Sequence, residues 1–267
     1  MKWKALTQNE NKTMKHIILI IATLIAINAG ASNTLQLADS AYIEDRYANA
    51  IELYEQVIAN EGTSTDIYYN LGNSYYRAGL LGKAIVNYER ALILDPTNED
   101  AKANLEFVNS KITDIPGDKG TFLSNFFGKI IYSQHSNTWA IYAIVSFILL
   151  LISIAIYVFS AKIAMRKIGF FGGIAFLFVT IILVIFALIS YKAAVNRNEA
   201  IITSPSTILS TSPREPKDRS EEAILLHEGT KVEILDSVTD LNKTKWYDVK
   251  VDNNHRAWLN SQDAEKI

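Results

Sequence analysis

The sequence contains no cysteine, which excludes disulfides, thiolate metal sites and cysteine nucleophiles but leaves the compartment open. It also lacks the G-x-S-x-G, H-E-x-x-H and P-loop motifs. Histidine is scarce, and the four present are scattered along the chain: His16, His135, His227 and His255. We therefore predict that the protein is not an enzyme and that it holds neither a cofactor nor a metal ion.

The chain has no marked excess of charge of either sign, since 26 basic residues face 28 acidic ones and the net charge is −2. Binding to nucleic acid relies on an excess of basic residues, so we predict no nucleic-acid partner. What the sequence does have is an uneven supply of apolar residues. They gather in three blocks, Ile17–Ile27, Thr138–Ser160 and Gly169–Tyr191.

The first apolar block is short and is typical of a secretory signal peptide. Lys15 precedes it, and the small residues of Ala29-Gly30-Ala31 follow it. A basic start, a short apolar stretch and a small-residue exit predict cleavage after Ala31 and a signal peptide over residues 1–31. The alternative is an uncleaved signal anchor.

The second and third blocks are long enough to cross a membrane. Each contains more than 20 residues without a charge, and roughly 20 suffice for a transmembrane helix. We predict such helices at residues 138–160 and 169–191. Gly169 and Gly173 either form a close-packing face or ease the turn between the helices, and their place at the predicted helix start favours the turn.

The connection between these helices, residues 161–168, fixes the expected topology. Its only charges are positive: Lys162, Arg166 and Lys167. Short basic loops stay on the cytoplasmic side. Together with the signal peptide, this predicts a two-pass protein of the cytoplasmic membrane with both flanking domains on the periplasmic, extracytoplasmic side.

Residues 65–98 carry the pattern Y-x-x-L-G-x-x-Y…A-x-x-x-Y…A…P, which resembles the tetratricopeptide repeat in spacing and in length. The matching positions are Tyr68, Leu71, Gly72, Tyr75, Ala84, Tyr88, Ala91 and Pro96. A weaker match, with Leu37, Ala38, Ala50 and Tyr54, covers residues 31–64. Residues 98–112 begin a third register as a capping helix. We predict an array of five helices over residues 32–115.

The resemblance implies a binding groove along the first helix of each repeat. The positions that face a ligand in the family fall on Asp66, Tyr69, Asn73, Tyr76 and Arg77, with Asp39 and Tyr42 upstream and Asp100 and Phe107 in the capping helix. Tyr68 and Tyr75 are expected in the core with Leu71 and Gly72. The implied ligand is a segment of a protein. The alternative is that the tyrosines at positions 69 and 76 only form a solvent-exposed helix face and bind nothing.

Two further segments complete the chain. Residues 116–137 include FLSNFFGKIIY, which reads either as a linker helix packed on the array or as an amphipathic helix in the membrane interface. Residues 199–267 alternate in short strands and turns, which predicts a small β-barrel. Their order resembles the bacterial SH3-like domain.

Two features of this SH3-like segment could bind a ligand. Trp246 and Trp258 are candidate surface residues, although the composition of barrel cores favours a structural role for each. His227 and Glu228 lack the further ligands that a metal site needs, so we expect a surface pair.

The complete order of segments predicts a multi-domain α and β protein: a tetratricopeptide solenoid, a transmembrane hairpin and an SH3-like barrel. It resembles the BatE-type proteins of the aerotolerance operon. That resemblance implies von Willebrand-type membrane proteins and a MoxR-type ATPase as partners during envelope stress. We predict a membrane-anchored scaffold. The alternative is an envelope sensor whose SH3-like domain binds cell-wall peptide or peptidoglycan.

Overall fold

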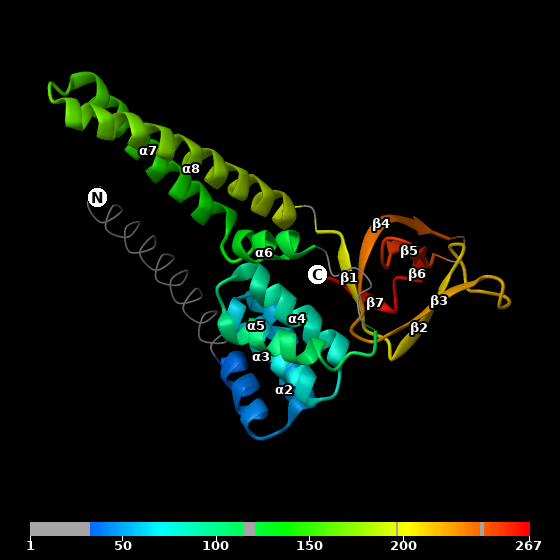
Figure 1. The fold of residues 1–267 in the computed structure, drawn as a ribbon. Coiled ribbons are helices and arrows are strands. Elements are labelled where there is room, and N and C mark those ends of the chain that lie inside the picture. Colours follow the sequence, from blue (N-terminus) through cyan, green and yellow to red (C-terminus); the bar gives the residue numbers. More distant parts are fainter. Residues whose placement is uncertain (1–32, 115–120, 196, 241–242) are drawn as a thin grey trace, which may run out of the picture.

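The computed structural model describes residues 33–114, 121–195, 197–240 and 243–267, so the predicted signal peptide lies outside the described residues. An array of short helices, a long helical hairpin and an antiparallel sheet follow one another along the chain (Figure 1). The array and the sheet both lie at the end of the hairpin where its two helices enter and leave (Figure 1).

The array consists of five helices, as the sequence predicts. Residues 33–43 form the first, followed by α2 (Tyr47–Glu61), α3 (Thr65–Arg77), α4 (Leu81–Leu94) and α5 (Glu99–Asn109). The side chain of Ser64 accepts a hydrogen bond from the Ile67 N–H at the start of α3. Gly79 ends this helix at φ 81°, a conformation that glycine adopts cheaply, and so turns the chain into α4.

The core of the array forms where α3 and α4 press together. A Cβ atom on Gly72 would lie 2.8 Å from Cδ1 of Tyr88, so only glycine admits this ring. Tyr75 is buried, as predicted. Tyr68 is only half-buried and lies beside Arg90, which differs from the expected core position. The preceding residue, Ile67, is the buried one at this end of α3. Successive side chains on a helix point about 100° apart, so Tyr68 does not point into the core together with Ile67.

The hairpin consists of α7 (Ser136–Phe159) and α8 (Ile163–Val195), two helices long and apolar enough to cross a membrane. The predicted connection at residues 161–168 is too long, because α8 begins at Ile163 and includes Arg166. The positive charges mark where the apolar stretch ends. They do not mark the end of the helix, because Ala, Met, Arg and Lys all favour helical structure.

Small residues bring the two long helices into close contact. A Cβ atom on Gly169 would lie 2.6 Å from the backbone nitrogen of Tyr157 and 2.7 Å from the Ser153 carbonyl oxygen. The expectation that the glycines ease the hairpin turn is therefore wrong. Both glycines lie inside α8, after the turn, and they allow close packing of α8 against α7. Further along, the Thr180 hydroxyl lies 2.9 Å from that of Ser146 and joins the helices by a hydrogen bond.

The C-terminal segment forms a seven-stranded antiparallel sheet in the order β3-β2-β6-β5-β4-β1-β7. Its strands are β1 (Glu199–Ile202), β2 (Ser206–Ser210), β3 (Glu222–His227), β4 (Lys231–Thr239), β5 (Lys245–Lys250), β6 (Arg256–Asn260) and β7 (Ala264–Lys266). The predicted barrel is wrong, because β3 and β7 end the order of strands within the described residues and the sheet stays open. Strand β7 extends the sheet beyond β1 at the edge that faces α4.

The two tryptophans of the sheet differ in their surroundings. Trp246 is only 2% exposed, and its indole N–H lies 3.4 Å from Oδ2 of Asp240. Trp246 is thus a core residue, which agrees with the structural role that composition favours and removes it from the candidate surface. Trp258 is half-buried on β6, paired in register with Asp248.

Candidate partner-binding face of the helical array

The first helices of the repeats, namely residues 33–43, α3 and α5, build one face of the array, here called the first-helix face. At its centre Asn73 Oδ1 accepts hydrogen bonds from the Tyr88 hydroxyl at 2.7 Å and from Nδ2 of Asn104 at 2.8 Å. Asn104 Nδ2 also lies 3.3 Å from the Tyr69 hydroxyl. These bonds hold Asn73 by its oxygen and leave its own amide hydrogens out of the network.

An aromatic pair with a lysine forms the second part of this face. The rings of Tyr76 and Phe107 meet edge to face with centroids 5.8 Å apart. Lys111 Nζ donates to the Tyr76 hydroxyl at 2.8 Å and lies 4.4 Å from the Phe107 ring centroid. Phe107 nevertheless stays 51% exposed. An exposed aromatic side chain that its neighbours hold in place is the kind of residue that dominates protein interfaces.

The first repeat contributes the remaining predicted residues of this region. Asp39 accepts a hydrogen bond from the Tyr54 hydroxyl at 2.5 Å. Burial and this bond raise the pKa of Tyr54, so the hydroxyl stays a neutral donor. Tyr42 packs edge to face against Tyr47, with centroids 5.7 Å apart. Asp39 and Tyr42 are thus committed to contacts inside the first repeat, although both remain half-buried.

The structure does not bring Asp66 and Arg77 into the same cluster. Asp66 is exposed in the first turn of α3, whereas Arg77 closes the last turn, about 16 Å away at 1.5 Å per residue. The Arg77 guanidinium lies 3.1 Å from Asp45 Oδ1 and 4.6 Å from the Tyr47 ring centroid. Arg77 therefore fastens the end of α3 to the first repeat.

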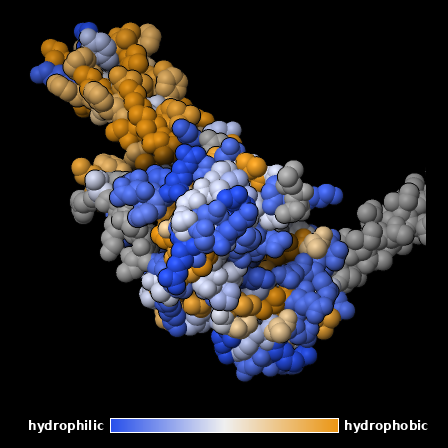
Figure 2. All heavy atoms as spheres, turned by 90° about the vertical axis from the view of Figure 1, so that its right-hand side faces the viewer, coloured by the Kyte–Doolittle hydropathy of each residue, from blue (hydrophilic) through white to orange (hydrophobic). Residues whose placement is uncertain are grey.

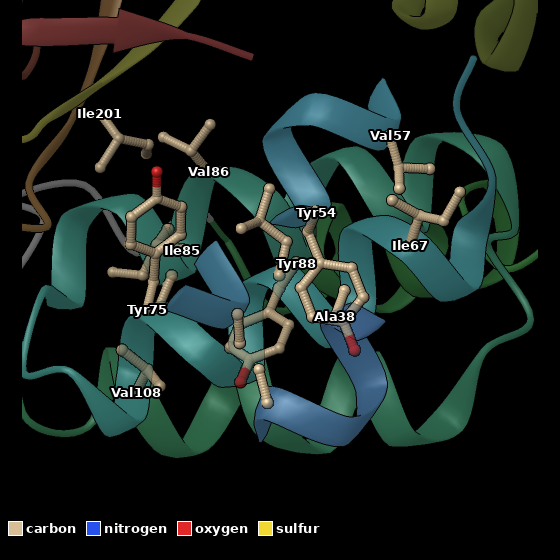
Figure 3. Packing of buried hydrophobic residues seen from close by; sticks show 14 residues of the cluster. Ala38, Tyr54, Val57, Ile67, Tyr75, Ile85, Val86, Tyr88, Val108 and Ile201 are labelled. Atoms are coloured by element: carbon tan, nitrogen blue, oxygen red, sulfur yellow. The ribbon is translucent and has the colours of Figure 1, made fainter. Parts of the chain in front are cut away.

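The opposite side of the array, at α4, is covered by the C-terminal sheet. Ile201 of β1 is buried in the same cluster as Ile85 and Val86 of α4 (Figure 3). The Gly82 N–H, in the first turn of α4, donates to Glu228 Oε1 at 2.9 Å. A binding segment therefore has the first-helix face available to it, but not this part of α4.

Ion pairs surround this apolar contact. Lys231 Nζ lies 2.6 Å from Glu89 Oε1 and 3.3 Å from Glu199 Oε2. Burial by itself lowers the pKa of Lys231, but the two carboxylates outweigh it and raise the pKa. Arg90 donates to Glu265 Oε1 and to the Lys266 carbonyl oxygen, both at 2.7 Å. The bonds of Lys231 to Glu89 and of Arg90 to β7 join α4 to the sheet, so the array and the sheet are held together as one unit.

Asp114, just after α5, forms the most complete polar contact between the array and the sheet. Its Oδ2 accepts from the His227 N–H at 2.6 Å and from the Thr230 hydroxyl at 2.7 Å, while Oδ1 lies 3.0 Å from His227 Nδ1. Burial by itself raises the pKa of Asp114, but these hydrogen bonds outweigh it and hold the pKa below its ordinary value.

We expect this carboxylate to make the array–sheet contact weaken in acid. Because the docked state favours ionised Asp114, its contribution is present above the unfolded pKa of about 3.9 and is lost as the pH falls through the lower folded pKa. Unfolding in urea between about pH 5 and pH 2 measures this. The loss of stability should be smaller in Asp114→Asn than in the unchanged chain, and an equal loss in both would contradict the assignment.

Several of these residues were missed by sequence reasoning. Lys111 lies 34 positions after Arg77, so extending the family pattern through α5 would have found it. Asn104 lies 34 positions after Asn70, which is not a groove position, so the pattern does not mark it. His227 and Glu228 were expected on the surface, but they contact Asp114 and Gly82. No local pattern marks such single polar residues, because their partners lie more than 100 positions away.

The comparison with known families agrees with the helical array. The tetratricopeptide repeat family matches residues 65–98, which include α3 and α4, and this confirms the resemblance noted in the sequence. No curated protein matches the chain. Among solved structures, the Sgt2 TPR domain from Aspergillus fumigatus matches at 22% identity and a TM-score of 0.29, covering 30% of this chain and 54% of that one. The chain thus spans about half the length of that domain.

Proposed function

We propose that this protein is a membrane-anchored scaffold that holds a segment of a partner protein on the first-helix face of its array. One observation carries the proposal. Phe107 stays open to solvent beside the half-buried Tyr76, and Lys111 holds the pair in place, while the sheet covers the array at α4. Ordered aromatic side chains cost little conformational entropy when a partner covers them, so they favour binding.

The chemistry of this face suits a peptide with an apolar side chain in a polar backbone. The apolar side chain would pack on Phe107, and the amide hydrogens of Asn73 would donate to a backbone carbonyl. No catalytic role belongs to this proposal. The resemblance to BatE-type proteins supports von Willebrand-type membrane proteins and a MoxR-type ATPase system as the partners in stress tolerance.

In this proposal α7 and α8 cross the cytoplasmic membrane. Lys162, Arg166 and Lys167 at the hairpin tip support a cytoplasmic tip, because short basic connections are retained on that side. A hairpin returns the chain to the side from which it came, so the array and the sheet both lie outside. The polar surface of these two parts and the apolar surface of the hairpin support this division (Figure 2).

The C-terminal sheet has a supporting role in this proposal. We assign it to the SH3-like class on the order of its short strands, although the sheet is open. Its contacts with α4 hold the array in a fixed orientation above the membrane. The alternative of a cell-wall sensor has less support, because burial removes Trp246 from its candidate binding surface.

Replacing Tyr76 and Phe107 together with alanine tests the scaffold. Two interface aromatics at about 1 kcal/mol or more each predict a loss of affinity of at least about 30-fold. Quantitative co-purification of membrane proteins with the full chain measures this. Tyr68→Ala with Leu94→Ala removes a tyrosine and a large apolar side chain away from this face and should leave recovery unchanged. Unchanged recovery with the Tyr76 and Phe107 variant would contradict the proposal.

A further inference from the structure

Helix α6 (Phe122–Ile131) carries large apolar side chains with about half or more of their surface exposed. Leu123 is 64% exposed, Phe126 is 52% exposed and Phe127 is 47% exposed. The rings of Phe126 and Phe127 meet edge to face at 5.6 Å. Large apolar side chains gathered on one short helix mark a surface that meets an apolar partner.

The position of α6 is fixed relative to the hairpin. Ile131, at the end of α6, is buried, and its carbonyl oxygen accepts a hydrogen bond from the Trp139 indole at 2.9 Å. The Ser190 hydroxyl of α8 lies 3.4 Å from the carbonyl oxygen of Gln134. These contacts hold α6 at the end of the hairpin where α7 begins and α8 ends, beside the array (Figure 1).

This level is the membrane surface if α7 and α8 span the bilayer, so the inference rests on the proposed membrane anchoring. Trp139 starts the apolar stretch of α7, and tryptophan concentrates where hydrocarbon meets headgroups. The exposed apolar side chains of the hairpin begin at this level, where α6 lies beside the end of α8 (Figure 1). The occupant of the apolar face of α6 is therefore the lipid that already surrounds the hairpin.

We propose that α6 lies in the outer interface of the bilayer, with Leu123, Phe126 and Phe127 among the upper acyl chains of the phospholipids. Interfacial helices bury their apolar face about 5–10 Å into the headgroup and acyl boundary. Lys129, exposed in the last turn of α6, would reach the lipid phosphates. The helix thereby gives the array a second attachment to the membrane and limits its tilt above the surface.

The absence of cysteine makes a direct test practical, because single labels attach at chosen positions only. Nitroxides are placed by Phe127→Cys, Leu123→Cys and Lys129→Cys in the full chain, reconstituted into vesicles of phosphatidylethanolamine and phosphatidylglycerol. Power-saturation EPR then compares collisions with oxygen, which concentrates in lipid, and with a water-soluble nickel complex. We expect high oxygen and low nickel accessibility at positions 123 and 127, and the reverse at 129.

High nickel accessibility at 123 and 127 would overturn the proposal by placing α6 in water. Low accessibility to both reagents there would overturn it as well, since a protein surface would then cover the helix. Leu177→Cys, midway along α8, serves as the reference for the hairpin. If its label is inside the lipid while those on α6 are not, only the inference about α6 fails. If its label is in water, the membrane anchoring itself fails.

Discussion

Replacing Tyr88 with alanine is expected to lower the free energy of unfolding of the array by about 3–5 kcal/mol. Tyr88 is 1% exposed, and its ring fills the space that Gly72 leaves between α3 and α4. The substitution empties that space and removes the hydroxyl that donates a hydrogen bond to Asn73 Oδ1 at 2.7 Å. Pulse proteolysis of the full chain in urea measures the change, because cleavage follows the unfolded fraction of the exposed domains.

Tyr88→Phe is the matched control for this substitution. It keeps the ring and removes only the hydroxyl, so we expect a loss of about 1 kcal/mol. Asn73 would still accept from Asn104, which limits the cost. If Tyr88→Ala were as mild as Tyr88→Phe, the ring would not be the centre of the array core.

Replacing Gly82 with valine is expected to detach the sheet from the array without unfolding either. A Cβ atom at Gly82 would lie 2.4 Å from the Ile202 carbonyl oxygen and 2.9 Å from Cγ of Glu228. Because the first of these is a backbone atom, rotation of a side chain cannot relieve the clash. Double electron–electron resonance between labels at Glu61→Cys and Ser237→Cys should then change from one narrow distance distribution to a broad one.

Lys83→Val is the control for this effect. It places the same branched side chain at the next position of α4. There the Nζ atom of Lys83 lies 5.2 Å from the Tyr75 ring centroid. We expect the narrow distribution to survive there. A distribution that stays narrow in Gly82→Val would mean that the array and the sheet do not depend on this contact.

The array was predictable because its determinants repeat at short range. Gly72 and Tyr88 occupy fixed positions within one unit of 34 residues, so the pattern identifies the helices and their packing together. The hairpin was predictable for a similar reason, since length and apolarity alone define such helices. Its turn was not, because positive charges mark the end of the apolar stretch and not the end of a helix.

The contact between the array and the sheet was not predictable from the sequence. Glu228 and Gly82 lie 146 positions apart, and Asp114 and His227 lie 113 positions apart. Single polar residues carry no periodicity, so nothing in the sequence links them. The same contact explains the error about the barrel. Strand β7 pairs with β1 at the edge that meets α4, and the sheet ends there and does not close on itself.

The division of α3 into a core side and a binding side was only partly predictable. Tyr75 and Leu71 are buried, and Tyr69, Asn73 and Tyr76 are half-buried, as the family pattern implies. The tyrosines nevertheless do more than face a ligand. Tyr69 contacts the Tyr88 ring, with centroids 6.1 Å apart, and so belongs to the support of the face. The position of a residue in the repeat predicts which way its side chain points, but the neighbouring residues determine how much of that side chain stays exposed.

Site-specific photo-crosslinking in cells tests the scaffold most directly. A benzophenone amino acid at Tyr76 lies on the first-helix face, whereas one at Tyr68 lies beside Arg90, away from that face. We predict adducts between this chain and one or a few membrane proteins from position 76, lost when Phe107 is replaced with alanine, and none from position 68. Equal adducts from both positions, or adducts from position 68 alone, would contradict binding at the first-helix face.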